Sequence, residues 1–213
     1  MITLSQVIPH PVKEQGKHRI SQVWNTEVQF EQGLKYLVSA PSGKGKSSLL
    51  SIIYGLRFDY DGNVLWQDIN IRSFTRNKWA DIRQRHVSLL FQDMHLFPNL
   101  SAWENLHIKS TLSNKGINKL PMEMAEQLGI AHLLKKATKL LSYGERQRLA
   151  LIRSLLQPFE FLLLDEPFSN LDDGNTAIAA QLIKTEVAKR GAAIIVADLS
   201  HSYDFEYDIV LDL

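Results

Sequence analysis

Residues 36–55 read YLVSAPSGKGKSSLLSIIYG, and this stretch decides the fold of the chain. An apolar run at 36–38 leads into a loop of small residues at 40–48, and a second apolar run leads out and stops at Gly55. This is the order strand, glycine-rich loop, helix. Small residues let the backbone curl so that successive N–H groups point at one anion, and the helix dipole adds positive potential there. The stretch therefore predicts a phosphate site.

Two side chains of the loop suit phosphate chemistry. Lys46 would sit as a point charge on the β- and γ-phosphates, and the Ser47 hydroxyl would be a ligand of Mg²⁺. The usual pattern is G-x-x-x-x-G-K-[ST], and Ala40 stands at its first glycine, a mild change unless that position needs a positive φ. The alternative to a phosphate site is a flexible surface loop that happens to contain the sequence Gly-Lys-Gly-Lys-Ser. The residues that we expect to bind the nucleotide are Pro41, Ser42, Gly43, Lys44, Gly45, Lys46, Ser47 and Ser48.

Composition excludes several classes of protein. The chain has 213 residues, a hydrophobic content of 45%, no cysteine and a net charge of +1. Without cysteine there are no disulfides, no thiol chemistry and no cysteine-ligated metal. Lys and Arg are spread along the chain, so we expect no nucleic-acid partner. The start shows no signal peptide, and no window approaches 18 apolar residues, so we expect no direct membrane insertion.

Apolar periodicity and turn residues place the elements. Strands alternate with helices, which predicts an α/β P-loop core of mainly parallel sheet with helices on both faces. We expect an antiparallel β portion at the N-terminus, a turn at Asp59-Tyr60-Asp61-Gly62, and a strand at 161–164. The expected helices cover 76–85, start at about 102, start at Pro121, run from Ser142 to about Leu156, and cover 174–190.

This order suggests one domain over 1–213. Residues 1–92 and 141–213 would form the nucleotide-binding core with its β portion, and residues 93–140 a helical subdomain inserted between strands.

Polar side chains follow four predicted strands: Lys46, Gln92, Asp165 and Asp198. Ligands of parallel sheets bind at the carboxyl ends of strands, so these groups can converge on one edge. In the expected division of roles, Asp165 holds Mg²⁺ through water, and Glu166 polarises the attacking water. Gln92 can ligate Mg²⁺ or orient water. Asp165 and Glu166 could alternatively be ordinary residues where a strand leads into a turn. Gln92 could alternatively be a polar residue that follows a strand and has no role in a site.

Ser142-Tyr143-Gly144-Glu145 has capping-box spacing at the start of a helix. A capping box needs no ligand, yet a helix N-terminus also attracts anions. One way to use both this helix start and the phosphate loop is a dimer, in which each chain offers its helix start to the other chain's nucleotide.

The order of these motifs resembles the nucleotide-binding subunit of an ATP-binding cassette (ABC) transporter over nearly the whole chain. Phe91-Gln92 resembles the Q-loop, 141–148 the signature, 162–166 the Walker B strand and 169–172 the D-loop. The signature followed closely by Walker B and D-loop is highly specific to this family. The sequence at 96–101 and 104–105 most resembles the branch of lipoprotein-release, macrolide-export and cell-division cassettes, although importers have similar sequences there.

The resemblance implies ATP and Mg²⁺ as cofactors and a head-to-tail homodimer that closes over two ATP. Ser142 and Gly144 of one subunit then reach the γ-phosphate bound by the other. It also implies a transmembrane transporter subunit that docks near 93–110, and a cytoplasmic location, peripheral on the inner face of the membrane through that partner. The substrate is set by the membrane subunit.

The sequence departs from the family at several positions. Tyr143 replaces a signature glycine, and no adenine-stacking aromatic is evident, with His10 near its place. Asp198 occupies the place of the histidine that contacts the γ-phosphate, and His201 could serve only if the loop were rearranged. Negative charge there predicts slowed hydrolysis with ATP binding kept.

Three functions remain at this point. The first is an ATPase subunit that powers a transporter or transenvelope complex, with Glu166, Gln92 and Asp198 as its catalytic candidates and Ser47, Gln92 and Asp165 as its metal ligands. The second is an ATP-dependent clamp or signalling module with little turnover, which Asp198 and Ala40 favour. The third, a soluble cassette acting on DNA or ribosomes, fits poorly with a single chain of this length and charge.

Overall fold

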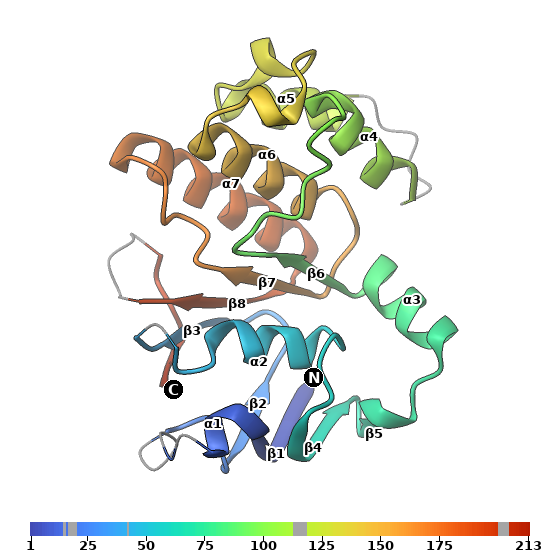
Figure 1. Cartoon of the computed structure of the whole chain (residues 1–213), viewed down its shortest axis with the longest axis vertical. Coiled ribbons are helices and arrows are strands. Elements are labelled where there is room, and N and C mark those ends of the chain that lie inside the picture. The colour runs from blue at the N-terminus through green and yellow to red at the C-terminus, as the bar shows by residue number, and fades with distance from the viewer. Residues whose placement is uncertain (15, 17–20, 42, 113–118, 200–204) are drawn as a thin grey trace.

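The computed structural model describes residues 1–14, 16, 21–41, 43–112, 119–199 and 205–213, and Figure 1 draws the whole chain. Within those residues the larger sheet has five parallel strands in the order β6-β7-β8-β3-β9. The bounds of these strands are β3 Lys35–Ser39, β6 Val87–Leu90, β7 Phe161–Asp165, β8 Ala193–Asp198 and β9 Ile209–Asp212. The predicted fold class, α/β with a mainly parallel sheet, is confirmed.

Side chains of the parallel strands alternate between two apolar cores, one on each face. Leu162 and Leu164 of β7 pack in the core that holds helices α6 and α7, whereas Leu163 packs in the core that holds α2. The bounds of these helices are α2 Lys46–Ile53, α6 Tyr143–Leu155 and α7 Asp173–Arg190 (Figure 1). Because both faces of the sheet's centre are covered, β7 and β8 are buried at every position and are almost wholly apolar.

The smaller sheet is antiparallel, in the order β2-β1-β4-β5, and packs against the other side of α2 (Figure 1). The bounds of its strands are β1 Ile2–Pro9, β2 Glu27–Phe30, β4 Tyr60–Trp66 and β5 Ile69–Asn70. The short helix α1, His10–Glu14, follows β1, and the 3₁₀ turn η1, Ile71–Ser73, follows β5. The predicted antiparallel portion is therefore present.

The turn predicted at residues 59–62 is wrong, because Tyr60 already begins strand β4. Gly62 marks a β-bulge there: the register against β1 shifts between Ser5 and Ile8, and φ at Gly62 is +87°. A Cβ at this glycine would lie 2.2 Å from the carbonyl oxygen of Gln6. Gly62 does adopt the positive φ that glycine favours, but it lies at a bulge in the sheet and not at a reversal of the chain.

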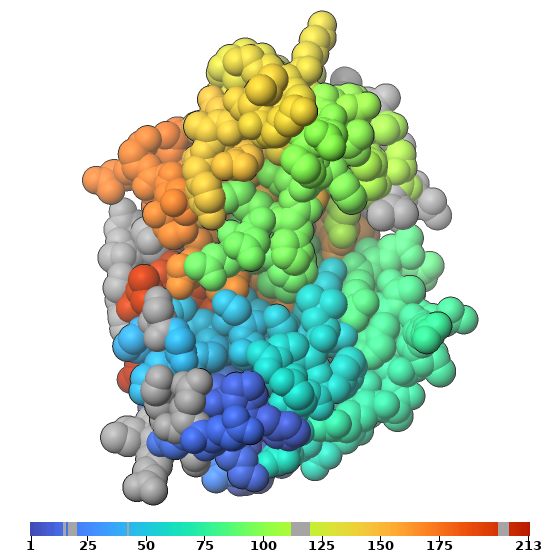
Figure 2. Space-filling view, in the orientation of Figure 1, coloured from blue at the N-terminus to red at the C-terminus, as the bar shows by residue number. Residues whose placement is uncertain are grey.

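Most predicted helices are confirmed. Helix α3 covers Arg76–Arg85, α4 covers Ala102–Leu112 and α5 covers Lys119–Gln127. Helix α5 begins two residues before Pro121, the expected start. The 3₁₀ turns η2, Ala131–Leu133, and η3, Thr138–Leu140, lead to α6. In Figure 2 the green and yellow segments that hold α4 and α5 form one end of the molecule, and the blue N-terminal sheet forms the other. The subdomain boundaries stay a prediction.

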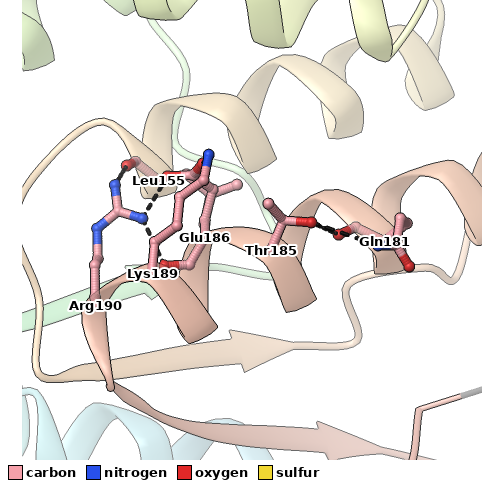
Figure 3. A network of polar contacts seen from close by, with 6 residues as sticks. All are labelled: Leu155, Gln181, Thr185, Glu186, Lys189 and Arg190. Atoms are coloured by element: carbon pink, nitrogen blue, oxygen red, sulfur yellow. Dashed lines mark hydrogen bonds and ion pairs between the residues drawn. The ribbon is translucent and has the colours of Figure 1, made fainter.

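Two helix starts follow the local rules of the sequence. Ser142 caps α6 in a complete capping box with Glu145, and Asp172 caps α7. Polar contacts then tie the end of α7 to α6: Arg190 donates to the carbonyl oxygen of Leu155 at 3.1 Å and also pairs with Glu186 (Figure 3). The contact with Leu155 joins the C-terminal ends of α6 and α7.

Candidate functional site

The carboxyl ends of the parallel strands bring the predicted polar groups to one edge. Strand β8 lies between β3 and β7, with Ser39 opposite Asp198 and Asp165 opposite Ala197. A cavity of about 390 Å³ opens over the loop at this edge. The residues that line it are Pro11, Val12, Gly43, Gly45, Lys46, Ser47, Ser48, Gln92 and Glu166. Pro41 and Lys44 do not line it, and Ser42 lies outside the described residues.

Trp24 and Val12 pack against the phosphate loop and constrain its backbone. Gly45 has φ of +104°, and a Cβ there would lie 3.1 Å from the Trp24 ring and 3.2 Å from Val12. The Trp24 indole N–H donates to the carbonyl oxygen of Lys44 at 3.3 Å. Ala40, by contrast, is not among the described residues with positive φ, so the missing first glycine causes no backbone strain.

Lys46 is buried at 5% exposure and its ammonium group is shared between two oxygens. It donates to the carbonyl oxygen of Ala40 at 2.6 Å and lies 3.3 Å from the Glu166 carboxylate. The Gln92 amide N–H donates to the other oxygen of Glu166, also at 3.3 Å. Glu166 thus holds two of the predicted phosphate-site groups, and a bound phosphate would compete with it for Lys46.

The backbone of Glu166 has an unusual conformation, with φ of +46°. Its N–H donates to Ala197 of β8 at 2.9 Å, and its carbonyl accepts from the side chain of Gln147 at 3.2 Å. Gln147 also donates to the Pro167 carbonyl at 2.6 Å. A left-handed non-glycine residue persists only where its surroundings over-determine it, as strands and α6 do here. Helix α6 therefore contacts the exit of β7 directly.

Asp165 fits a role in holding Mg²⁺. It is 6% exposed, and its Oδ1 has no hydrogen-bond partner in the described structure. Burial raises the pKa of Asp165, and the nearby Ser47 hydroxyl opposes that shift. Carboxylate, hydroxyl and amide oxygens are the hard ligands that Mg²⁺ takes, and Asp165, Ser47 and Gln92 offer one of each.

Asp198 is also buried at this edge, with 4% exposure. Its Oδ1 accepts from the N–H of Leu199 at 2.6 Å, and its Oδ2 has no partner in the described structure. Burial, with the neighbouring carboxylates of Glu166 and Asp165, raises the pKa of Asp198 to about 6. Neither Asp165 nor Asp198 lines the cavity itself, and His201 lies outside the described residues.

Ser142 and Gly144 do not join the cavity of their own chain. The backbone N–H of Ser142 donates to Glu145 at 2.7 Å and its hydroxyl accepts from the N–H of Glu145 at 3.3 Å, so the capping box is closed. Tyr143 is 44% exposed, with the Arg146 guanidinium 5.3 Å from its ring centre. One chain therefore supplies the phosphate loop and the acidic pair, but not the signature residues.

Sequence reasoning missed Trp24, Val12, Pro11 and Gln147. Trp24 and Val12 contact the loop through tertiary packing, which no local sequence pattern predicts. Gln147 lies inside the signature text, but its bonds to the exit of β7 are tertiary. His10 turns away from the cavity: its ring lies 3.3 Å from the Asp61 carboxylate.

Comparison with known proteins decides the family. The profile of the family described as ABC transporter matches residues 23–169. The chain belongs to the ABC transporter family. The resemblance seen in the sequence is thereby confirmed, and with it the class of P-loop ATPases to which the chain is assigned.

Several ABC proteins are similar over most of this chain. The lipoprotein-releasing system ATP-binding protein LolD of Buchnera aphidicola subsp. Schizaphis graminum is 33% identical over 170 residues, 78% of this chain and 74% of that protein. The glucose import ATP-binding protein GlcV of Saccharolobus solfataricus is 33% identical over 183 residues. That match covers 84% of this chain but 52% of GlcV, so the chain spans about half the length of that relative.

A solved structure shares the fold. The dimeric structure of MJ0796, a bacterial ABC transporter cassette, has a TM-score of 0.84 at 24% identity, covering 100% of this chain and 94% of that one. As for the membrane, none of the helices in the described part of the chain has the length and apolar character that crossing a bilayer requires.

Proposed function

We propose that this chain is the ATP-binding and ATP-hydrolysing subunit of a complex in which it dimerises around two ATP and drives a separate membrane transporter or transenvelope machine. One observation carries the proposal: Lys46 and Gln92 each contact Glu166 in the lining of a single cavity above a glycine loop. These three groups come from three separate strand ends, which is the arrangement that phosphoryl transfer needs.

Each residue of the site has a distinct task in this proposal. Lys46 binds the terminal phosphates, and in doing so it releases the Glu166 carboxylate that it now holds. Glu166 then accepts a hydrogen bond from the attacking water and polarises it, with Gln92 orienting both. Ser47, Asp165 and Gln92 would hold Mg²⁺, which supplies charge neutralisation at the phosphates.

The proposed dimer would supply the signature residues that the cavity of one chain lacks. Ser142 and Gly144 lie outside the cavity of their own chain, at the start of a helix whose dipole favours an anion. In a head-to-tail dimer each helix start completes the partner's site over the γ-phosphate. The membrane partner docks near 93–110, and the chain works at the inner face of the membrane through that partner. The names of its relatives, ATP-binding proteins of release and import systems, support this setting.

The second candidate is an ATP-dependent clamp or signalling module with little turnover. The buried Asp198 favours it, because this carboxyl stands near Glu166 at the edge where the family has a histidine. The two candidates differ in turnover and not in binding. ATP affinity measured beside the hydrolysis rate, with and without the membrane partner, separates them.

The direct test of the first candidate is Glu166→Gln. The amide keeps the shape of the side chain but accepts protons poorly, so ATP should still bind while hydrolysis falls at least about a hundredfold. The dimer should accumulate with ATP, as measured by size-exclusion chromatography with light scattering. Glu126→Gln, at an exposed position of α5, is the matched control and should change neither quantity. Normal turnover in Glu166→Gln would show that Glu166 is not the base.

A further inference from the structure

The turn that carries Glu166 is not one that its own residues favour. Its φ of +46° is left-handed, which is unfavourable for a residue with a Cβ, and the ring of Pro167 restricts the backbone of the residue before it. Within the turn, the carbonyl oxygen of Glu166 accepts from the Ser169 hydroxyl at 3.2 Å and from the Ser169 N–H at 3.4 Å. Both distances exceed the usual range for hydrogen bonds, so these local contacts hold the turn weakly.

A buried side chain of another element, Gln147 of α6, holds the exit of this turn. Its side-chain amide donates to the carbonyl oxygen of Pro167 at 2.6 Å and to that of Glu166 at 3.2 Å. Because both partners are carbonyl oxygens, the nitrogen of the amide faces the turn. Gln147 is 4% exposed, so water competes little for these carbonyl oxygens. One side chain therefore bridges two successive carbonyl groups of the turn.

The N-terminal part of α6 is closely seated against the segment that follows β7. A Cβ at Gly144 would lie 3.0 Å from the carbonyl oxygen of Asn170. The Arg148 guanidinium donates to the side-chain oxygen of Asn175, in the first turn of α7, at 2.6 Å. Gln147 lies between these two contacts in the sequence. The helix is thus fixed on both sides of Gln147, which makes it a firm support for the turn.

We propose that Gln147 is a positioning residue for ATP hydrolysis: by holding the turn in its left-handed form, it aims the Glu166 carboxylate into the phosphate cavity. The inference rests on the proposed function, in which Glu166 polarises the attacking water, and it names the group that sets where that carboxylate points. Backbone dihedral angles decide the direction of the Cα–Cβ bond. From the present backbone, the carboxylate lies 3.3 Å from both Lys46 and Gln92. Gln147 itself does not line the cavity, so it acts through Glu166.

The chain offers a closely matched control in a second buried glutamine, Gln157, which lies just beyond the other end of α6. It is 3% exposed, and its side-chain amide also bridges two carbonyl oxygens, those of Arg83 at 3.0 Å and Val87 at 2.7 Å. In both glutamines the side-chain oxygen has no hydrogen-bond partner among the described residues. Gln157 contacts the start of β6 and not the end of β7, so it shares the bonding of Gln147 without its place beside Glu166.

Substitution of each glutamine by methionine removes the donor and keeps the approximate length of the side chain. Both variants should have a lower urea midpoint, since each leaves two buried carbonyl oxygens without a donor. Only Gln147→Met should lower kcat at least about tenfold, because a misplaced base is costly, while ATP affinity stays within about threefold. Gln157→Met should keep kcat within about twofold. An unchanged kcat in Gln147→Met, or an equal fall in Gln157→Met, would overturn the inference and leave the proposed function standing.

A double-mutant cycle with Glu166→Gln tests whether Gln147 acts through Glu166. In that background, Gln147→Met should change the residual single-turnover rate by less than about twofold, since the group that it positions is no longer a base. A further tenfold fall would refute the route through Glu166. Normal turnover in Glu166→Gln alone would instead remove the proposed base, and the inference with it.

Crystal structures of the two nucleotide-free methionine variants give a readout that does not depend on turnover. In Gln147→Met the Glu166 carboxylate should leave Lys46, and φ at Glu166 should leave the left-handed region. In Gln157→Met both features should be retained. A Glu166 that keeps its backbone and its contact with Lys46 in Gln147→Met would refute the positioning role.

Discussion

Replacing Asp198 by asparagine should stabilise this protein, and by an amount that depends on pH. Burial at 4% exposure raises the pKa of Asp198 from 3.8 to about 6. Each pKa unit corresponds to about 1.4 kcal/mol of difference between the charged and neutral forms. The charged carboxylate therefore lowers the free energy of unfolding by about 3 kcal/mol once both the folded and the unfolded states are ionised.

The direction of the pH dependence of stability follows from which state, folded or unfolded, holds the Asp198 proton more tightly. The folded state keeps the proton of Asp198 up to about pH 6, whereas the unfolded chain releases it near pH 4. The penalty is therefore absent below about pH 4, grows through that interval and is complete above about pH 7. Asparagine carries no such proton. Asp198→Asn should gain about 3 kcal/mol at pH 8 and about half of that at pH 5.

Urea unfolding of the two proteins at pH 5, 6, 7 and 8 measures this difference. Asp68→Asn is the matched control, because Asp68 is exposed in the turn between β4 and β5 and should shift stability by less than about 0.5 kcal/mol at every pH. A gain that does not change with pH, or a loss of stability at pH 8, would refute the argument that a buried charge at Asp198 is unfavourable.

Two further substitutions probe the phosphate site. Under the proposed function, Asp198→His should raise the rate of ATP hydrolysis, since it would remove negative charge from beside the γ-phosphate and place there the histidine that the family pattern has; an unchanged steady-state rate would contradict the proposed effect of Asp198. Gly45→Ala should weaken ATP binding at least about tenfold and lower the free energy of unfolding by about 1–3 kcal/mol, because φ is +104° and the new Cβ would press on Trp24. Fluorescent-nucleotide titration and urea unfolding measure these two effects, and wild-type values in both would show that the loop can adopt another conformation.

Several elements of the fold were predictable because their signals are local. Thr75 and Arg76 begin a helix where the pattern predicted one, and Gly191 ends α7 with φ of +57°. Capping bonds and apolar periodicity are read within a few residues, so the chain outside them has little influence. The turn predicted around Gly62 failed for the opposite reason: the same glycine serves a bulge once β1 lies across from it, and β1 is more than 50 residues away in the sequence.

The sequence by itself determined the family and the order of strand, phosphate loop and helix, and it named the candidate residues of the phosphate site, because those motifs are runs of neighbouring residues. Only the tertiary structure decided how they meet. It joins Lys46 to Glu166 and Glu166 to Gln92, and it places Asp198 where burial raises its pKa to about 6. Burial and charge pairing depend on which distant segments pack together, as with Gln92 and Glu166, 74 residues apart, and no local pattern carries that information.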